Sequence, residues 1–285
     1  MKSTLPGPWV DPDRRESAPW TNNDGIVKFI EFPVRVPTMS HRAFHLYWQR
    51  HHSPNVMNVT GFSQFMRKYN TGHVYPEKVH GLPGDYRQTT PFEGAAEVWV
   101  NGLDEVSAWL GHPLYGELIQ PDEPRFIRQD GSVEVIVAKE ERLYEPELDL
   151  QETGLTKLYV LFKRRAELER DEFHQELSAS GKLLLAQPAL RALLRKLVIS
   201  HKLRDPLPEG LPLADIDAVG EFWFDDRKDI ARLFQDSAYV ESIQPRERRI
   251  TDSNSTRALV AKMHVVHDEF SFQPSTMQPL PFAWN

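Results

Sequence analysis

An internal repeat constrains the fold of this chain more than any other feature of its sequence. Glu97-Val-Trp99 recurs as Glu221-Phe-Trp223, and Ile119-Gln-Pro121 recurs as Ile243-Gln-Pro245. Both matches have the same offset of 124 residues (221 − 97 and 243 − 119). Self-similarity at a fixed offset indicates a duplicated structural unit. The two halves of the chain are therefore expected to share one element order.

The offset changes slightly along the chain, which places the length differences in loops. Phe44-His45 recurs as Phe173-His174 at an offset of 129 (173 − 44), and His73 recurs as His201 at 128 (201 − 73). Because the offset returns to 124 at Glu97, the loop before this residue is four residues longer in the first copy.

The first copy reads as β-α-β-β-α-β, the order of a ferredoxin-like unit. The expected elements are strand 28–36, helix 40–53, strand 62–70, loop 71–91, strand 92–100, helix 104–118 and strand 132–143. The same order follows from residue 155, and an antiparallel sheet needs its second face covered. We predict an α+β fold of two tandem ferredoxin-like domains, packed sheet to sheet as an α+β barrel. The expected parts are an N-terminal arm (1–27), a first domain (28–145), a second domain (155–268) and a C-terminal strap (269–285).

Aromatic side chains are the expected anchors of the arm and the strap, which show no hydrophobic period. They are Trp9 and Trp20 in the arm, and Phe272, Phe282 and Trp284 in the strap.

Charge and composition exclude several classes of function. The formal net charge of −7 over 285 residues provides no basic surface for nucleic acid or an anionic membrane. The absence of cysteine excludes disulfides and thiol catalysis. No apolar run reaches the roughly 18 residues of a membrane-spanning helix, so we expect a cytoplasmic protein. The sequence also lacks the glycine-rich and nucleophile motifs of nucleotide-binding proteins and serine hydrolases.

The helix expected after Ser40 ends in a concentration of ionisable groups. Ser40 is a good N-cap, and Pro54 is expected to end the helix at residue 52 or 53. Helical spacing places five side chains on one buried face: Phe44, Tyr47, Trp48, His51 and His52.

The pattern Phe44-x3-Trp48-x3-His52-x-Pro54, with Ile119–Glu123 and Phe126 closing the unit, resembles the EthD family of dimeric α+β barrels. The resemblance covers about 28–140, with a fainter copy over 155–268. It implies a homodimer and a cofactor-free enzyme that dehydrates, decarboxylates or cyclises aromatic or polyketide substrates. The second copy departs from the motif, because the corresponding residues are Glu176, Leu177, Gly181 and Leu183.

Comparing the two copies separates scaffold from candidate site. Glu97 and Trp99 are kept in both copies, so we assign them to the fold, with Glu97 pairing locally with Lys or Arg. His52 occurs in one copy only, and an imidazole can exchange protons at neutral pH. The predicted catalytic residues are His52, Tyr69 and His51. The predicted substrate-binding residues are Tyr47, Trp48, Asn70, Arg67, His73 and Tyr86.

Structural interpretations remain open for several of these residues. His52 could satisfy a carbonyl at the helix end, Phe44 could be simple core, and Asn70 could serve a turn. The working pocket is expected in the first copy, between the Ser40 helix, its sheet and loop 71–91.

We predict no metal and no cofactor. His41 and His45 are four residues apart, but at 1.5 Å per residue His41 lies roughly 16 Å along the helix from His52. The predicted function is a cofactor-independent lyase that removes water, CO2 or a small carbonyl fragment from a bulky aromatic or polyketide-like molecule. The alternatives are a cofactor-free monooxygenase, a heme-binding barrel and a non-catalytic protein that binds aromatic ligands.

Overall fold

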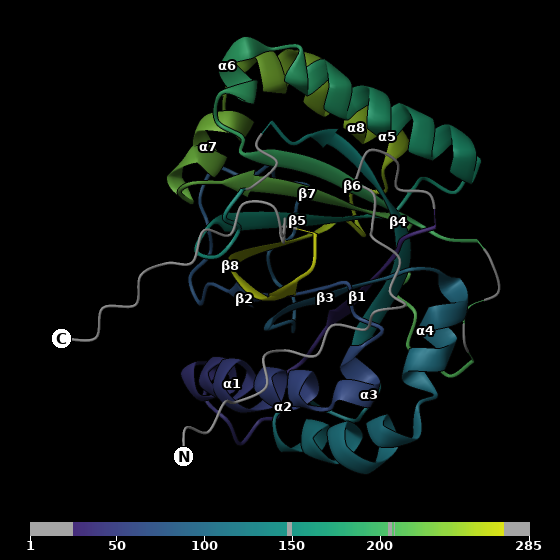
Figure 1. Ribbon diagram of the computed structural model, residues 1–285. Coiled ribbons are helices and arrows are strands. Elements are labelled where there is room, and N and C mark those ends of the chain that lie inside the picture. The colour runs from purple at the N-terminus through teal and green to yellow at the C-terminus, as the bar shows by residue number, and fades with distance from the viewer. Residues whose placement is uncertain (1–24, 147–149, 205–206, 208, 271–285) are drawn as a thin grey trace, which may run out of the picture.

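The computed structural model describes residues 25–146, 150–204, 207 and 209–270 (Figure 1). The expected anchors Trp9, Trp20, Phe272, Phe282 and Trp284 lie outside the described residues. The strands are β1 (Val27–Phe32), β2 (Lys68–Val74), β3 (Gly94–Val100), β4 (Glu134–Tyr144), β5 (Thr156–Phe162), β6 (Lys196–Lys202), β7 (Ala218–Phe224) and β8 (Arg257–Asp268). The α-helices are α1 (His41–Tyr47), α2 (Ser53–Asn58), α3 (Thr60–Ser63), α4 (Leu103–Leu110), α5 (Arg170–Leu185), α6 (Pro188–Arg191), α7 (Lys228–Phe234) and α8 (Gln244–Ile250). The π-helical turns, which are wider than an α-helix, are η1 (Trp48–His52), η2 (Tyr115–Ile119) and η4 (Tyr239–Ile243). The tighter 3₁₀ segment is η3 (Gln120–Arg125).

The eight strands form one closed antiparallel barrel in the order β1-β3-β2-β8-β5-β7-β6-β4. Each half contributes four neighbouring strands in the ferredoxin-like order, β4-β1-β3-β2 and β8-β5-β7-β6. The long last strand of each half pairs with the second strand of the other, as β4 with β6 and β8 with β2. The prediction of an α+β barrel is confirmed. However, the halves join at both edges into one sheet instead of stacking as two separate sheets. One chain therefore closes the barrel without a partner, and the homodimer stays a prediction.

Two groups of helices cover opposite sides of the barrel (Figure 1). Helices α1 to α4 lie over the strands of the first half, and α5 to α8 lie over those of the second. Side chains alternate along each strand between this outer helical layer and the barrel interior. In β1, Phe29 packs in the core under the first helical group, whereas Ile30 belongs to the core inside the barrel.

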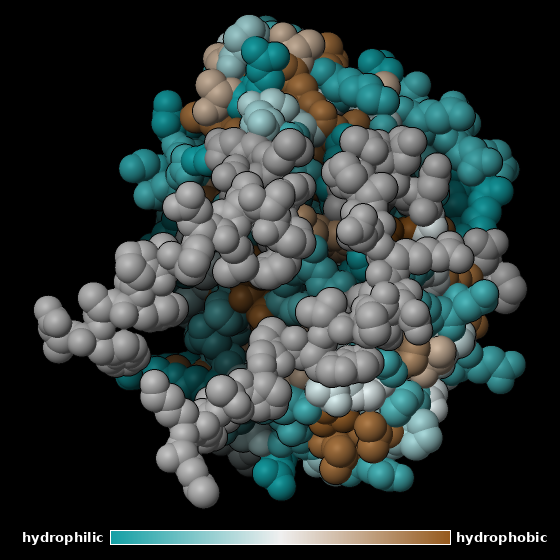
Figure 2. Space-filling view, viewed as in Figure 1, coloured by the Kyte–Doolittle hydropathy of each residue, from teal (hydrophilic) through white to brown (hydrophobic). Residues whose placement is uncertain are grey.

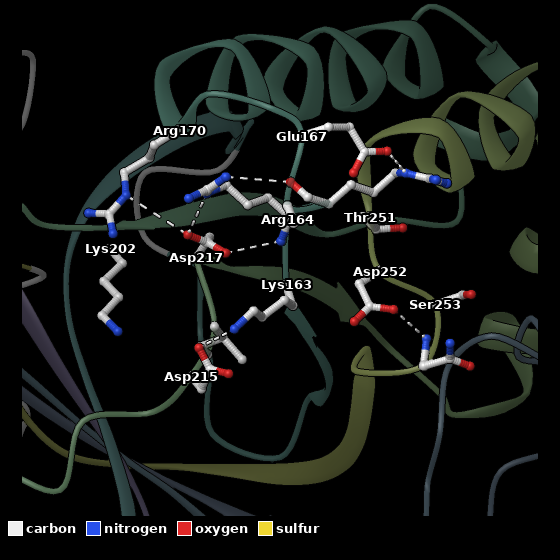
Figure 3. Close-up of a pocket in the computed structure, with 14 residues that line it drawn as sticks. Lys163, Arg164, Glu167, Arg170, Lys202, Asp215, Asp217, Thr251, Asp252 and Ser253 are labelled. Atoms are coloured by element: carbon white, nitrogen blue, oxygen red, sulfur yellow. Dashed lines mark hydrogen bonds and ion pairs between the residues drawn. The ribbon is translucent and has the colours of Figure 1, made fainter.

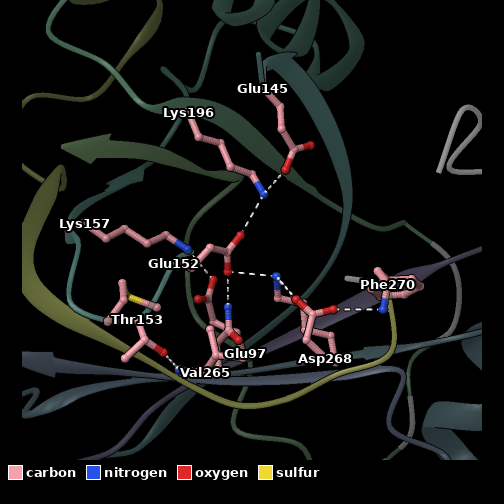
Figure 4. Close-up of polar contacts among 12 residues, drawn as sticks. Glu97, Glu145, Glu152, Thr153, Lys157, Lys196, Val265, Asp268 and Phe270 are labelled. Carbon is pink, nitrogen blue, oxygen red and sulfur yellow. Dashed lines mark hydrogen bonds and ion pairs between the residues drawn. The ribbon is translucent and has the colours of Figure 1, made fainter. Parts of the chain in front are cut away.

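Buried charges occupy part of the barrel interior. Lys157 Nζ lies 2.6 Å from Glu97 and 2.5 Å from Glu221, and Lys28 Nζ contacts the same two carboxylates. Figure 4 shows Glu152 placed beside these groups, where it pairs with Lys196 at 3.0 Å. Burial alone would raise the pKa of Glu97, but the two lysines hold it below its ordinary value. Glu97 pairs with lysine as predicted, although Lys157 comes from the second half instead of a local neighbour. Its assignment to the scaffold stays a prediction.

The helix that begins after Ser40 continues past its predicted end at residue 52 or 53. Ser40 caps the helix, since its Oγ accepts a hydrogen bond from Ala43 N. Pro54 does not end it: the chain continues through the π-helical turn η1 into α2, where Pro54 lies in the first turn. Proline is tolerated there because a first-turn N–H needs no intrahelical partner.

Two further predicted elements are wrong in detail. Residues 60–63 form helix α3, and Phe62 packs in the core under α4, so strand β2 begins only at Lys68 and runs on to Val74. The helix predicted over 104–118 ends at Leu110 before Gly111, and η2 and η3 carry the chain onward.

The loop after β2 covers the second half instead of the first. Because β2 pairs with β8, the loop leaves β2 beside second-half strands. Tyr86 then packs against Phe234 and Phe162, and Val79 joins the same core. The expected place of this loop over a first-half pocket is therefore wrong.

The space-filling view shows a mainly hydrophilic surface wherever described residues are visible, with brown hydrophobic patches near its upper and lower ends (Figure 2). Among the described residues, no helix combines the length and the apolar character needed to cross a membrane.

Candidate functional site

The π-helical turn sets which side chains of the first helix point inward. Phe44, Trp48, His52 and Val56 are spaced four residues apart, and all four are buried. A regular α-helix would rotate this row steadily away from the sheet, because it has 3.6 residues per turn. The wider turn at Trp48–His52 keeps the row facing inward. The same geometry turns His51 outward, where it is exposed and its ring packs on that of Tyr47.

His52 lines a small apolar cavity between the helices and the outer face of the first-half sheet. The cavity has a volume of about 70 Å³. Most of its lining is apolar or aromatic, and all of it comes from the first half. The lining residues are Phe29, Glu31, Trp48, His52, Val56, Phe62, Met66, Tyr69, Ala96, Val98, Trp109, Leu110, Tyr115, Ile119, Glu123 and Ile127.

A carboxylate orients the His52 ring. His52 Nδ1 lies 3.0 Å from Asp122 Oδ2, and Tyr47 Oη donates a hydrogen bond to Asp122 Oδ1. Burial lowers the pKa of His52, and the Asp122 carboxylate offsets only part of this effect. His52 is therefore neutral at neutral pH. With Nδ1 engaged by Asp122, Nε2 is the nitrogen that remains for proton exchange.

Tyr69 is fixed beside His52 at the start of β2. Its Oη accepts a hydrogen bond from Trp48 Nε1 at 3.3 Å and lies 3.2 Å from Ser53 Oγ. Burial raises the pKa of Tyr69 to about 12, so the phenol stays protonated. Tyr69 can thus donate a hydrogen bond to an oxygen atom in the cavity.

Two carboxyl groups in the same cavity hold protons near neutral pH. Burial, together with nearby Glu123, raises the pKa of Glu31 to about 8. Burial also raises the pKa of Glu123 to about 7, although Tyr115 Oη donates to its Oε1 at 2.8 Å. The cavity therefore combines a neutral imidazole with protonated carboxyl groups, and such a pairing suits a base and an acid acting together.

The structure brings only three of the nine predicted site residues to the cavity: His52, Tyr69 and Trp48. Tyr47 is not among the residues that line the cavity, and its Oη donates a hydrogen bond to Asp122. Asn70 points into the barrel, where its Nδ2 donates to Glu152 at 2.7 Å, because neighbouring strand residues face opposite sides. Arg67 pairs with Glu269 at 2.9 Å at the barrel end.

Tyr86 and His73 also lie away from the cavity. Tyr86 donates to Glu247 in the second half, which follows from the course of its loop. His73, on β2, contacts His45 of α1, with 2.8 Å between their Nδ1 atoms. Burial lowers the pKa of His45 to about 3 and that of His73 to about 4.

Sequence comparison of the two copies could have found only some of the missed residues. Asp122 corresponds to Arg246 at the offset of 124, so its absence from the second copy marks it as a candidate. Tyr115 and Glu123 recur as Tyr239 and Glu247, which also form a hydrogen bond, of 2.6 Å. The same comparison therefore assigns this pair to the scaffold and misses its place in the cavity.

In the second half, Gly181 is the counterpart of His52. A Cβ at Gly181 would lie 2.4 Å from Leu143 Cδ1, so a leucine of β4 fills the space. The counterparts of Tyr47 and Asp122 are Glu176 and Arg246, which form an ion pair at 2.9 Å.

Larger and more open cavities lie elsewhere. A groove of about 640 Å³ is lined by second-half residues, mostly charged, and Figure 3 shows Arg164 and Arg170 directed at Asp217 within it. A second groove of about 600 Å³ lies beside α1, with His45, His73 and His264 in its lining. The working pocket was expected in the first copy. The groove of about 640 Å³ is lined by second-half residues, whereas the apolar cavity that contains His52 belongs to the first half, so the place of the working pocket stays a prediction.

Comparisons with known proteins agree with this architecture. The family model for the EthD domain matches residues 36–130 and 165–254, one segment in each half. No curated protein matches the chain in sequence.

Solved structures show the same fold at very low identity. An anthrone oxidase-like protein matches with a TM-score of 0.56 and 10% identity, covering 86% of this chain and 94% of that one. A protein from Lactobacillus acidophilus, provisionally described as a monooxygenase, matches with a TM-score of 0.50, 8% identity and coverage of 85% and 96%. A provisional chlorite dismutase matches with a TM-score of 0.51, 8% identity and coverage of 86% and 97%.

Proposed function

Because this chain belongs to the EthD family, we propose that it is a cofactor-independent lyase, with His52 as the proton-transferring group in the first-half cavity. One observation carries the proposal: a neutral histidine, oriented by Asp122, opens onto an apolar cavity that also contains carboxyl groups with raised pKa values.

Loss of water is the reaction that this set of groups supports best. His52 Nε2 removes a proton from a substrate carbon, and Asp122 stabilises the resulting imidazolium. The electron pair of the broken C–H bond forms a C=C bond as the C–O bond to the hydroxyl breaks. Protonated Glu31 or Glu123 supplies the proton with which the hydroxyl leaves as water. Tyr69 donates a hydrogen bond to a substrate oxygen and holds it in place.

The size of the cavity limits the substrate. An engineered cavity of about 150 Å³ binds benzene, whereas this cavity measures about 70 Å³. The bulky polyketide-like substrate expected from the family resemblance does not fit it. We propose a compact aromatic molecule that carries its hydroxyl on a saturated carbon next to a C–H bond, as this elimination requires, and that is admitted when side chains at the cavity wall move. A heme is also too large for this cavity.

Turnover of a panel of compact hydroxylated ring compounds tests the proposal, with mass spectrometry to detect the loss of water. The His52→Gln variant keeps a hydrogen-bonding group but cannot titrate near neutral pH, so turnover should fall roughly 10²- to 10⁴-fold. His51→Gln is the matched control, because His51 is exposed on the same helix. It should leave turnover unchanged. An active His52→Gln enzyme would overturn the proposal.

A cofactor-free monooxygenase is the second candidate, and the apolar lining of the cavity favours it. A substrate carbanion formed by His52 would persist in such a lining long enough to react with O2. Oxygen consumption and a product that has gained an oxygen atom would identify this reaction. Binding of the panel without any turnover would instead identify a non-catalytic binding protein.

A further inference from the structure

Three side chains converge outside the barrel at the beginning of α1. His41 and His45 lie one turn apart on α1, and Glu93 directly precedes β3. His41 Nδ1 lies 2.6 Å from Glu93 Oε2, and His45 Nε2 lies 3.9 Å from the same oxygen. The three atoms all lie within 4.8 Å of one another.

Neighbouring groups hold two of these side chains in place. His45 Nδ1 lies 2.8 Å from His73 Nδ1, and His73 Nε2 lies 3.0 Å from Thr71 Oγ1. When His45 donates to His73 and His73 donates to Thr71, the lone pair of His45 falls on Nε2, which faces Glu93. The other oxygen of Glu93 accepts a hydrogen bond of 2.9 Å from Arg35 Nε. Such outer partners fix the tautomer and orientation of metal ligands in proteins.

His45 Nε2 is buried and has no hydrogen-bond partner within the described part of the chain. Buried polar atoms are rarely left without a partner, so a missing one points to an ion or a ligand. His41 and His45 both line the groove of about 600 Å³ beside α1, so the cluster lies at the edge of a space that is open to solvent.

The second half provides an internal comparison at the same place in the fold. Backbone hydrogen bonds Glu93 N→Pro33 O and Asp217 N→Phe162 O match at offsets of 124 and 129, so Asp217 is the counterpart of Glu93. At the same offset of 129, Arg170 stands where the first half has His41 (170 − 41).

This exchange changes the chemistry of the cluster. Arg170 lies 3.9 Å from Asp217 and Arg164 lies 3.3 Å from it, so two guanidinium groups neutralise the carboxylate (Figure 3). The counterpart of His45 is His174, whose Nε2 lies 3.2 Å from the backbone oxygen of Asp217 and is therefore satisfied. Compared with the second half, the first half has one positively charged side chain fewer at this place and one more neutral nitrogen that can bind a metal ion.

We propose that His41, His45 and Glu93 bind a divalent transition-metal ion, for which zinc is the probe. Two histidines four residues apart and one carboxylate form a common set of zinc ligands, with one position left for water. Zinc–ligand distances of about 2.0–2.1 Å place tetrahedral N and O ligands roughly 3.3 Å apart. His41 is 30% exposed and can therefore move outward from its 2.6 Å contact.

Zinc titration of the full-length, chelator-treated protein tests this site, with bound metal measured by calorimetry and elemental analysis. We expect one zinc ion per chain in the wild type. Glu93→Gln and His45→Ala should weaken binding at least 100-fold, and His73→Ala roughly 10- to 100-fold, because it removes an outer partner. The isosteric Glu93→Gln keeps the test decisive if His45→Ala fails to fold.

His174→Ala and His51→Ala are the matched controls, and both should retain one zinc ion. A wild-type protein that binds no zinc would overturn the proposal. Undiminished binding in the Glu93→Gln and His45→Ala variants would overturn it equally. The measurement does not depend on turnover, so its result is independent of the proposed lyase activity.

Discussion

His52 and Asp122 meet at the wall of the apolar cavity, and their contact sets the proton affinity of the imidazole. Burial lowers the pKa of His52, and the carboxylate 3.0 Å away acts in the opposite direction. Asp122→Asn removes the negative charge and keeps a hydrogen-bonding group. The pKa of His52 should therefore fall further below 6.5, which an NMR pH titration of its ring would measure.

The exposed Asp130 provides the control for this titration. Asp130→Asn should leave the pKa of His52 as it is in the wild type. A His52 pKa that rises or stays constant in Asp122→Asn would show that the carboxylate does not act on the ring.

The raised pKa of Glu31, in the same cavity, should make the stability of the folded protein depend on pH. Its pKa rises from an ordinary 4.5 to about 8 in the folded state, so the folded protein binds more protons than the unfolded chain between these values. Stability contributed by the protonated group is complete below about pH 4.5 and is lost as pH rises through about 8. Glu31→Gln mimics the neutral acid and lacks this dependence. Melting temperatures across pH 4 to 9 should show the wild type losing stability relative to the variant over that window. Parallel curves would contradict the raised pKa.

At the scale of single elements, the first helix shows what sequence patterns predict and what they miss. Ser40 as N-cap and the buried row of Phe44, Trp48 and His52 follow from local chemistry and periodicity. The π-helical turn does not, because it depends on packing of α1 and α2 against the sheet. A strict 3.6-residue period therefore placed His51 on the buried face, whereas it is exposed.

Pairing between the halves explains the other errors. The loop after β2 was expected over the first half because it follows first-half strands in sequence. Its course depends on the pairing of β2 with β8, which joins residues nearly 200 positions apart. Glu31, Glu123 and Tyr115 were missed for a similar reason, since only the folded sheet brings β1 and η2 to one cavity.

Leu143 of β4 fills the space beneath Gly181 of α5, and a larger side chain at this position tests the packing. Alanine favours a helix over glycine by about 0.5–1 kcal/mol, and the flexible end of Leu143 can yield to one methyl group. The further carbons of Gly181→Leu would also meet Leu197 and Ile199, so this variant should be less stable than Gly181→Ala by about 1–3 kcal/mol. Gly181→Ala is the matched control, because both side chains favour a helix. Urea unfolding of both variants measures the effect, and equal stability of the two would contradict the packing argument.

For the molecule as a whole, the charges inside the barrel couple the two halves. Glu97 of the first half is fully buried and contacts Lys157 of the second. Glu97→Gln leaves part of the lysine charge uncompensated, and breaking a buried ion pair costs about 3–5 kcal/mol. The urea concentration at the unfolding midpoint should fall accordingly. Glu77→Gln, which removes an exposed carboxylate facing Arg227, should leave the midpoint unchanged. A Glu97→Gln variant that is stable but inactive would instead assign the catalytic role to Glu97 inside the barrel.

The repeat in the sequence predicted the barrel class, because two β-α-β-β-α-β units have few ways to cover their sheets. It could not predict closure at the edges, which depends on β4 and β8 extending past their own halves. The cavity volume was also beyond sequence reasoning, since it depends on how side chains from six or more elements fill the space.

The central claim is that a compact aromatic ligand binds in the first-half cavity against His52. A crystal structure of the protein soaked with small hydroxylated aromatic compounds tests it most directly. We predict ligand density inside the cavity, with an oxygen or a reacting carbon about 2.6–3.2 Å from His52 Nε2 or Tyr69 Oη. Ligand density confined to the charged groove of the second half, with the cavity beside His52 still closed, would contradict the claim.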